Sequence, residues 1–235
     1  VIASIPDKKK RKIYYKWTKK EKQIDFTKEE KQWLQKNIII KYAFDPDWKP
    51  LEWADEIKDY KGITSDIIKL IKHKSGIHIK AIYSKNWDDV LEKIRSKSAD
   101  AYCTGDTTNN NLLYSKFNII KTPYVFVSRV DEDYLEGFKD IKHKKVGVFK
   151  DSTIQKILND KYPSLKLVLF TSDKDGMNML KEHKIDVAIF SALTAKYYIN
   201  SLGYKNILKI VYKTNFNLEL KFALQKDLGQ IPLSI

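Results

Sequence analysis

The strongest constraint on the fold is a pattern of short strands alternating with helices, which occurs twice along the chain. The first series begins with the β-branched and aromatic stretch "IIIKYAF" and continues through helix and strand patterns to "ADAYCTG". After the extended stretch "KTPYVFVSRV", a second series starts at "KKVGVFK" and ends with the helix pattern "SALTAKYYINSLG". Strands and helices that alternate across loops of a few residues are typical of open α/β sheets. We therefore predict two α/β units that are joined in the middle.

A last strand pattern, "LELKFALQKD", follows the second unit and is placed to cross back to the first. Two lobes joined by two extended crossings predict a cleft between them. Ligands of open α/β sheets bind outside the carboxyl ends of the strands, often against helix N-termini. The loops that we expect to line the cleft are "DPDWKP", "YSKNWDD", "CTGDTTNNN", "FKDSTIQ" and "IFSALT".

Helix boundaries are marked by capping residues. In "FTKEEKQWLQKN", Thr27 is a good N-cap and Glu30, three residues later, completes a capping box. The pattern "GITSDIIKLIKHKSG" predicts a helix that ends at Gly76. The residues expected on its buried face are Ile67, Leu70 and Ile71. We also expect a helix to start within "GDTTNNNLL", after the strand pattern "ADAYCTG".

The net charge is strongly positive, since 44 Lys and Arg residues against 30 acidic residues give +14. Such a charge suits a polyanion partner, but the lysines are scattered among acids along helical faces, as expected of a solvated surface. The densest run, "DKKKRKIYYKWTKK", contains Tyr14, Tyr15 and Trp17, which could stack on single-stranded bases. The same run fits an amphipathic helix with Ile13 and Trp17 on one face. We favour the helix and expect no nucleic-acid partner.

Several classes of site lack their signatures. No apolar run approaches the roughly 18 to 20 residues that cross a bilayer. Cys103 is the single cysteine, so that neither an internal disulfide nor a multi-cysteine zinc site can form. The four histidines fall in different predicted elements, and no phosphate-loop, "HExxH" or nucleophile-elbow motif is present. We expect no metal, no cofactor and no catalytic activity.

Taken in order, the segments resemble the periplasmic solute-binding proteins of family 3. They are most similar to the Venus-flytrap sensor domains of bacterial histidine kinases and diguanylate cyclases. The segments that carry the resemblance are "FTKEEKQWLQKNIIIKYAFDPDWKPLEW", the region from "YKGITSD" to "SKSADA", "TPYVFV", "KKVGVFKDSTIQKIL", "HKIDVAIFS" and "LELKFALQKD". The resemblance implies a two-lobed type 2 periplasmic-binding fold with two hinge crossings. Lobe 1 is expected over 26–122, lobe 2 over 123–215 and the return crossing over 216–235.

Residues 1–25 are expected to form a helical tail. The segment "SIPDKKKRKIYYKW" is similar to the tail that normally follows the return strand in these sensors, yet here it stands at the front. The hypothesis is that the chain comes from a receptor with tandem flytrap modules. An adjacent module or a receptor dimer partner is then expected, on the periplasmic side of the inner membrane. Contact with the membrane is expected only through other parts of the receptor.

The resemblance also bears on the ligand. Amino-acid binders of this family clamp the α-carboxylate with an Arg, and the corresponding position falls near Asn111 or Leu112. No Arg occurs between Arg95 and Arg129. The family's acid for the α-ammonium corresponds to Ser191. Because the loss of either clamp leaves a zwitterion poorly paired, we expect a ligand other than a standard α-amino acid.

The candidate ligand-binding residues follow strands or begin helices, or are implied by the resemblance. They are Asp45, Trp48, Trp87, Thr104, Gly105, Asp106, Thr107, Asn111, Tyr124, Ser152, Thr153 and Ser191. Hydroxyls and amides suit a neutral or weakly anionic ligand, whereas Asp106 could pair with an amine, and indole rings add cation–π binding. Each has a plainer interpretation: caps for "DTTNNN" and "DSTIQ", a turn for Asp45, a hinge for Tyr124, and a core or rim position for Trp53.

These observations favour a small-molecule sensing module of a signalling receptor, which closes on a ligand between two lobes. A free solute-binding component of a transporter is the nearest alternative. A charge-driven polyanion binder belongs to a different class and predicts steep weakening with salt. A few relatives of this fold are dehydratases with a cleft carboxylate, a role for which Asp45 or Asp106 would be the candidates.

Overall fold

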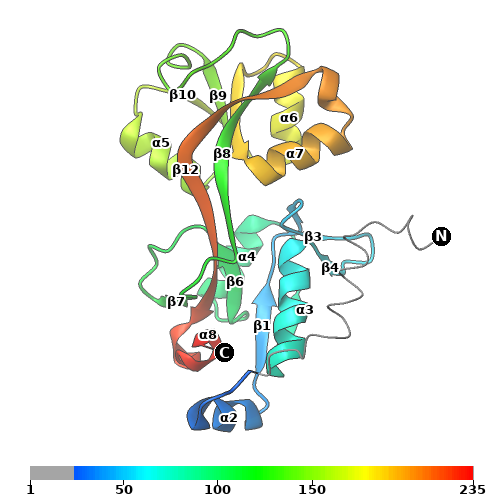
Figure 1. Ribbon diagram of the computed structural model, residues 1–235, viewed down its shortest axis with the longest axis vertical. Helices are drawn as coiled ribbons and strands as arrows, with labels where there is room; N and C mark the ends of the chain where they lie inside the picture. The colour runs from blue at the N-terminus through cyan, green and yellow to red at the C-terminus, as the bar shows by residue number, and fades with distance from the viewer. Residues whose placement is uncertain (1–23, 235) are drawn as a thin grey trace, which may run out of the picture.

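In the computed structural model, which describes residues 24–234, the chain forms two α/β halves joined by two long strands (Figure 1). These strands, β8 (Ile120–Arg129) and β12 (Leu208–Gln225), pair antiparallel and run side by side between the halves. The sheet order is β10-β9-β11-β8-β12-β6-β1-β5, with β7 paired to β12. The structure thus confirms the predicted two-lobed α/β fold with two extended crossings.

The first half contains a mainly parallel sheet. In it β1 (Ile39–Ala43) lies between β5 (His78–Ile82) and β6 (Ala101–Thr104) and is parallel to both. The short strand β7 (Leu112–Tyr114) pairs with β12. The helical elements of this half are α2 (Lys28–Gln35), α3 (Ile63–Ser75), α4 (Trp87–Arg95), η3 (Lys226–Leu228) and α8 (Ile231–Ser234).

The second half repeats this design. Its strands β9 (Lys145–Phe149), β10 (Lys166–Phe170) and β11 (Val187–Ser191) are parallel, and β11 pairs antiparallel with β8. The helical elements of this half are α5 (Thr153–Lys161), α6 (Asp173–Lys181), α7 (Ala192–Ser201) and η2 (Tyr204–Asn206). The two patterns that mark the ends of the second series, "KKVGVFK" and "SALTAKYYINSLG", form β9 and α7 as predicted.

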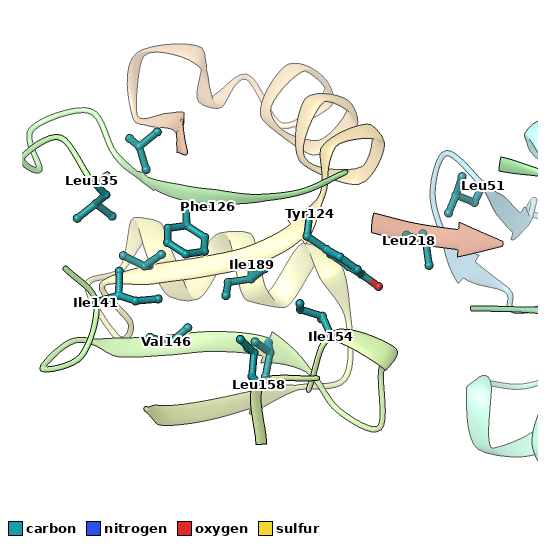
Figure 2. Packing of buried hydrophobic residues seen from close by; sticks show 13 residues of the cluster. Leu51, Tyr124, Phe126, Leu135, Ile141, Val146, Ile154, Leu158, Ile189 and Leu218 are labelled. Carbon is teal, nitrogen blue, oxygen red and sulfur yellow. The ribbon is translucent and has the colours of Figure 1, made fainter. Parts of the chain in front are cut away.

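The hydrophobic clusters divide mainly between the two halves, although the one around Phe126 also contains Leu51 of the first half. Figure 2 shows part of the second half's core, where Phe126, Val146 and Leu158 project from different elements into a common interior. These side chains are fully buried, and burial of such a side chain contributes about 1.5 to 3 kcal/mol. Tyr124 lies between the main part of this cluster and its members Leu218 and Leu51, with its hydroxyl directed away from Phe126 and Ile189 (Figure 2). The strand therefore presents one polar group at the border of the core.

The pairing of the two crossing strands is irregular at two points. The register between β8 and β12 shifts between Ile210 and Tyr212 and again between Lys213 and Asn217. Thr214 occupies the second irregularity, and its Oγ1 donates to the carbonyl oxygen of Tyr124 at 2.9 Å and accepts from the N–H of Phe216 at 3.1 Å. The expected lobe boundaries, 122/123 and 215/216, fall within β8 and at this irregularity of β12.

The predicted helix ends agree with the structure, but one predicted buried face does not. Thr27 and Glu30 form the capping box, and α3 ends at Gly76, whose φ of 76° is left-handed. Leu70 is 56% exposed, whereas Ile68 is only 5% exposed. The expectation for Leu70 was wrong, because the buried face of α3 is rotated. The residues that this face buries are Thr64, Ser65, Ile68 and Ser75.

Two loops contain strands that the sequence pattern missed. The segment predicted as the loop "DPDWKP" contributes β2 (Asp47–Trp48) to a small antiparallel sheet with β3 (Glu52–Ala54) and β4 (Tyr60–Lys61). The segment "GDTTNNNLL" leads into β7 rather than into a helix, so the expected helix start was wrong. The reason is that Leu113 pairs with Leu224 of β12, which offers a strand edge at this place.

The predicted helical tail over residues 1–25 lies almost entirely outside the described residues, as do Ile13, Tyr14, Tyr15 and Trp17. No helix within residues 24–234 combines the length and hydrophobicity that a membrane crossing requires.

Candidate ligand-binding cavity

A cavity of about 360 Å³ lies between the two halves. Pockets for small ligands occupy about 300 to 1,000 Å³, so this volume suits a small metabolite. The first half contributes Asp45, Trp48, Trp87, Leu91, Tyr102, Thr104, Gly105 and Asp106. The second half contributes Phe149, Lys150, Asp151, Ser152, Thr153, Ile154, Lys156, Asp173, Ile189, Phe190, Ser191 and Thr194. The crossing strands contribute Tyr124 and Leu218.

The ends of strands and the starts of helices supply these side chains. Asp45 follows β1 and Thr104 ends β6, as expected for ligand sites at the carboxyl ends of strands. In the second half Ser191 ends β11, Ser152 precedes α5, and Asp173 begins α6. In both halves, therefore, the carboxyl ends of the strands and the starts of the helices face the same cavity.

The halves touch each other directly at more than one place. Lys156 of the second half forms an ion pair with Asp106 of the first. Ser172 Oγ donates to Asp47 Oδ2 at 3.1 Å. Gly105 lies close to the second half, since a Cβ there would lie 3.1 Å from Thr153 Oγ1, and it would also lie 2.8 Å from Leu218 Cδ1 on the adjacent strand β12. The arrangement is a closed one, with contacts that can form only while the halves are together.

Two of the carboxylates at the cavity have lysine partners. Burial opposes ionisation of Asp106, but hydrogen bonds from Lys156 and Thr108 outweigh it, so that the pKa of Asp106 is lowered. Lys150 Nζ lies 3.9 Å from Asp151 Oδ2. These pairs account for both lysines at the cavity.

The other two carboxylates, Asp45 and Asp173, have no cationic partner among the described residues. They come from opposite halves and are 7% and 5% exposed. Asp45 Oδ1 accepts the N–H of Asp47 at 2.9 Å, whereas no hydrogen bond to the Asp173 carboxylate occurs within residues 24–234. Burial raises the pKa of Asp45 to about 6, partly offset by the Asp47 N–H. Burial, then repulsion from Asp45 and Asp47, raises the pKa of Asp173 well above its ordinary value.

Two tyrosines lie next to this acidic pair. Burial raises the pKa of Tyr124, and the charge of Asp173 raises it further. Burial also raises the pKa of Tyr198, with further contributions from Asp47 and Asp173. The Tyr198 hydroxyl is buried without a hydrogen-bond partner. The acidic pair is thus surrounded by aromatic hydroxyls rather than by cations.

A second buried acid, Glu52, holds the Asp45 loop in place. Glu52 is 1% exposed, and its Oε1 accepts the N–H of Asp45 at 2.9 Å. Its Oε2 accepts the hydroxyls of Tyr42 at 2.9 Å and Tyr60 at 3.1 Å. Burial raises the pKa of Glu52 to about 8 although these three bonds lower it. The sequence did not reveal this role, because it depends on contacts between β1, β3 and β4.

Several predicted hydroxyls are already used within the chain. Ser152 Oγ accepts the N–H of Gln155 at 3.3 Å, and Ser191 Oγ accepts the N–H of Thr194 at 3.1 Å. Thr104 Oγ1 accepts the N–H of Asp106 at 3.0 Å. These side chains therefore cap helices or close a turn while they also line the cavity.

The structure brings the predicted site residues to the cavity with two exceptions, since Thr107 and Asn111 are exposed and lie outside its lining. Trp53 is also outside the lining. The most consequential residue that sequence reasoning missed is Asp173. Its position in "TSDKDG" reads as an ordinary acid in the first turn of a helix, and only the fold places it opposite Asp45. No group of His, Cys, Asp or Glu within residues 24–234 is arranged to hold a metal ion.

Comparison with known proteins identifies related sequences. The profile of the bacterial extracellular solute-binding proteins, family 3, matches residues 40–133. The virulence sensor protein BvgS of Bordetella pertussis is 22% identical over 209 residues, and the sensor protein EvgS of Escherichia coli K12 is 24% identical over 214 residues. The matches cover 85% and 86% of this chain but only 17% of each sensor protein. The ABC transporter arginine-binding protein 1 of Escherichia coli K12 is 30% identical over 104 residues, 43% of this chain and 42% of that protein.

Solved structures show the same fold. The periplasmic VFT2 domain of BvgS superimposes with a TM-score of 0.78 and 20% identity, covering 89% of this chain and 90% of that domain. A histidine kinase sensor domain with similarity to periplasmic binding proteins gives a TM-score of 0.75 and 17% identity, over 85% of this chain and 90% of that chain. The predicted resemblance is confirmed by these matches.

Proposed function

We propose that this chain, a relative of family 3 solute-binding proteins and of the Venus-flytrap sensor domains of histidine kinases, is the extracytoplasmic sensing module of a bacterial receptor. The observation that carries the proposal is the cavity of about 360 Å³ between two halves that are joined by two strands. A small molecule that touches both walls binds the closed arrangement better than an open one. That difference in affinity is the signal.

The interlobe contacts fit this role. The pairs Asp106–Lys156 and Asp47–Ser172 exist only when the halves are closed, and each is solvent-accessible and hence weak. Weak contacts leave the balance between open and closed states to the ligand. In the proposed receptor the closure passes to an adjacent flytrap module or dimer partner in the periplasm. It then reaches a membrane helix elsewhere in that receptor.

The ligand is proposed to be other than a standard α-amino acid, and the chain to act by binding without catalysis. The cavity lining contains no arginine. Asn111, at the position where the family resemblance would place one, is outside the lining, and the hydroxyl of Ser191 caps α7. A zwitterion would therefore lack the paired charges that usually hold it.

A thermal-shift screen tests the proposal. The panel contains L-amino acids, organic acids, amines and purines, each at several concentrations. A ligand present at 100 times its dissociation constant adds about 2.7 kcal/mol to the free energy of unfolding. Small-angle scattering of the stabilised complex checks that the halves are closed. Stabilisation by no class would contradict the sensing function, and stabilisation by common L-α-amino acids would contradict the proposed ligand class.

A free solute-binding component of a transporter is the second candidate, supported by the partial match to an arginine-binding transport protein. Cell fractionation separates the two. A sensor is expected in the membrane fraction as part of a longer polypeptide, whereas a free binding protein is released with the periplasm.

A polyanion binder is the remaining alternative. If single-stranded nucleic acid binds through Tyr15 and Trp17, which lie outside the described residues, its affinity should fall in Trp17→Ala.

A further inference from the structure

The charges at the cavity indicate which chemical class of ligand it takes, an inference that rests on the proposed sensing function. We propose that the ligand is a small organic cation, an amine or guanidinium compound without an α-carboxylate. Its cationic group lies between the carboxylates of Asp45 and Asp173. Because these residues come from opposite halves, a cation held by both links the halves and favours closure.

When each lysine at the cavity is matched with the acid next to it, Asp45 and Asp173 remain without a cationic partner. The lining contains four carboxylates, Asp45, Asp106, Asp151 and Asp173, and two lysines. Lys156 pairs with Asp106, and Lys150 lies near Asp151. The chain as a whole carries +14, so cations are abundant elsewhere on its surface. In a protein with so many cations, two cavity acids that have no cationic partner are therefore suited to bind a positively charged ligand.

Burial makes the ionised forms of these two acids unfavourable unless a cation binds beside them. Asp45 and Asp173 are each more than nine-tenths buried. A buried ionised carboxylate without a partner loses much of its hydration free energy and regains little. Glu52, which is buried to a similar degree, accepts three hydrogen bonds from the chain. Asp173 accepts none within residues 24–234, so a cation that enters the cavity is the partner that would stabilise its charged form.

The aromatic side chains give independent support. Tyr124 is 5% exposed and lines the cavity, and its hydroxyl has no hydrogen-bond partner among residues 24–234. Figure 2 shows this hydroxyl directed away from Phe126 and Ile189. The indoles of Trp48 and Trp87 line the same cavity. Carboxylates combined with aromatic faces recognise ammonium and guanidinium groups, because charge attraction and cation–π attraction add.

Alternative guests fit less well. A metal ion prefers several oxygen ligands, and no group of three or more such residues is suitably arranged in the described part of the chain. A ligand carboxylate would need a free cation, and both lysines at the cavity already lie close to acids. The organic cation is thus favoured over a metal and over a zwitterion.

Isothermal titration calorimetry with matched pairs of compounds tests the inference on the unmodified protein. Agmatine is compared with arginine, which adds a carboxylate, and cadaverine with the neutral 1,5-pentanediol. Putrescine and calcium chloride complete the panel. We expect at least one of the three amines to bind with one-to-one stoichiometry, and arginine, 1,5-pentanediol and calcium to bind at least about tenfold more weakly.

Variants then assign the site. Asp45→Asn and Asp173→Asn are each expected to weaken amine binding by about 30-fold or more, since each removes one buried charge partner. Asp227→Asn is the matched control and should change affinity by less than about threefold, because Asp227 is exposed, pairs with Lys97 and lies outside the cavity lining. Thermal melting of each free variant checks folding, and the comparison of cadaverine with pentanediol holds even if a variant fails to fold.

The outcomes separate the two proposals. If another class of compound stabilises the protein while none of the amines binds, the organic cation is wrong and the sensing function stands. Equal binding of calcium or arginine, or an unchanged affinity in both folded Asp45→Asn and Asp173→Asn, also overturns the inference. If neither these amines nor any compound of the broader screen binds, both proposals fail.

Discussion

Two regions of the molecule bury charge, and they treat it differently. In the second half Arg129 is 6% exposed, and its Nη1 donates to the carbonyl oxygens of Leu180 and Ile185, both at 2.9 Å. Its Nη2 pairs with Glu132, which also accepts from Lys144 at 3.0 Å. At the cavity Asp173 is buried to the same degree with no such partner among the described residues. The chain can compensate a buried charge, so the lack of compensation at the cavity is consistent with a binding role.

Removal of the compensated charge should have the largest effect. Arg129→Met removes a donor from the carbonyls of Leu180 and Ile185, of which that of Leu180 still accepts the N–H of His183, and it takes a partner from Glu132. We expect the free energy of unfolding to fall by about 3 to 5 kcal/mol, measured by urea denaturation. Arg95→Met removes an exposed pair with Glu92 and should cost less than about 1 kcal/mol. If Arg129→Met lowered the free energy of unfolding by less than about 1 kcal/mol, the proposed difference between the region around Arg129 and the cavity would be wrong.

The uncompensated acids should make stability depend on pH in an unusual direction. The pKa of Asp45 is about 6 in the folded chain and about 3.8 when unfolded, so the folded state binds this proton more tightly. The free energy of unfolding should therefore fall as pH rises from about 4 through 6, by up to about 3 kcal/mol. Glu52, with a pKa of about 8, extends the fall to higher pH with the same sign.

Thermal melting at pH 5 and pH 8 measures this effect. Asp45→Asn should melt higher than the unmodified chain at pH 8 and should show a smaller difference between the two pH values. A melting temperature that rises steadily from pH 5 to pH 8 in the unmodified chain would show that the cavity acids are solvated like surface acids.

The comparison is sharpened by a variant that holds the halves apart. In Gly105→Ala the new Cβ meets Thr153 Oγ1 of the second half at 3.1 Å, while Leu218 Cδ1 of the adjacent β12, at 2.8 Å, is pushed toward the cavity, so the closed arrangement should lose about 1 to 3 kcal/mol. Opening would hydrate Asp45 and Asp173 and reduce the pH effect, while Arg129 stays buried. Small-angle scattering should show a larger radius of gyration. Gly137→Ala is the control, because its Cβ would come no closer than 3.9 Å to its neighbours.

The smallest effect is expected from the ion pair that joins the halves. The side chains of Lys156 and Asp106 are 58% and 30% exposed, so Lys156→Met should shift the balance toward the open state by only about 0.2 to 1 kcal/mol. Scattering at low and high salt measures the shift, since salt weakens the pair in the unmodified chain but not in the variant. Lys69→Met, which removes a pair within α3, should leave the scattering unchanged.

Much of the fold could be predicted because it is encoded locally. The capping box at Thr27, the left-handed Gly76 and the β-branched run of β1 act on their own neighbours, and a sequence pattern shows them directly. What the pattern missed depends on partners far along the chain. β7 exists because β12 offers an edge, and the exposed Leu70 reflects which face of α3 meets the sheet.

The same distinction applies to the candidate site. Asp45, Ser152 and Ser191 could be predicted because loops after strands and helix starts are recognisable along the chain. Asp173 could not, because its significance comes from its position opposite Asp45 in the other half. Asn111 was expected at the cavity from the family resemblance and from a helix start expected in "GDTTNNNLL", but the chain enters β7 here and Asn111 is exposed just before it.

The 18-residue strand β12 has a mechanical consequence. It leads back into the first half, where α8 and α2 pack on a common core through Ile231 and Leu34 (Figure 1). Both ends of the described chain therefore pack against the first half, and the second half is connected to it only through the two crossing strands, β8 and β12. We expect the second half to swing while the first stays fixed, so that any force exerted on a neighbouring molecule is delivered through the first half.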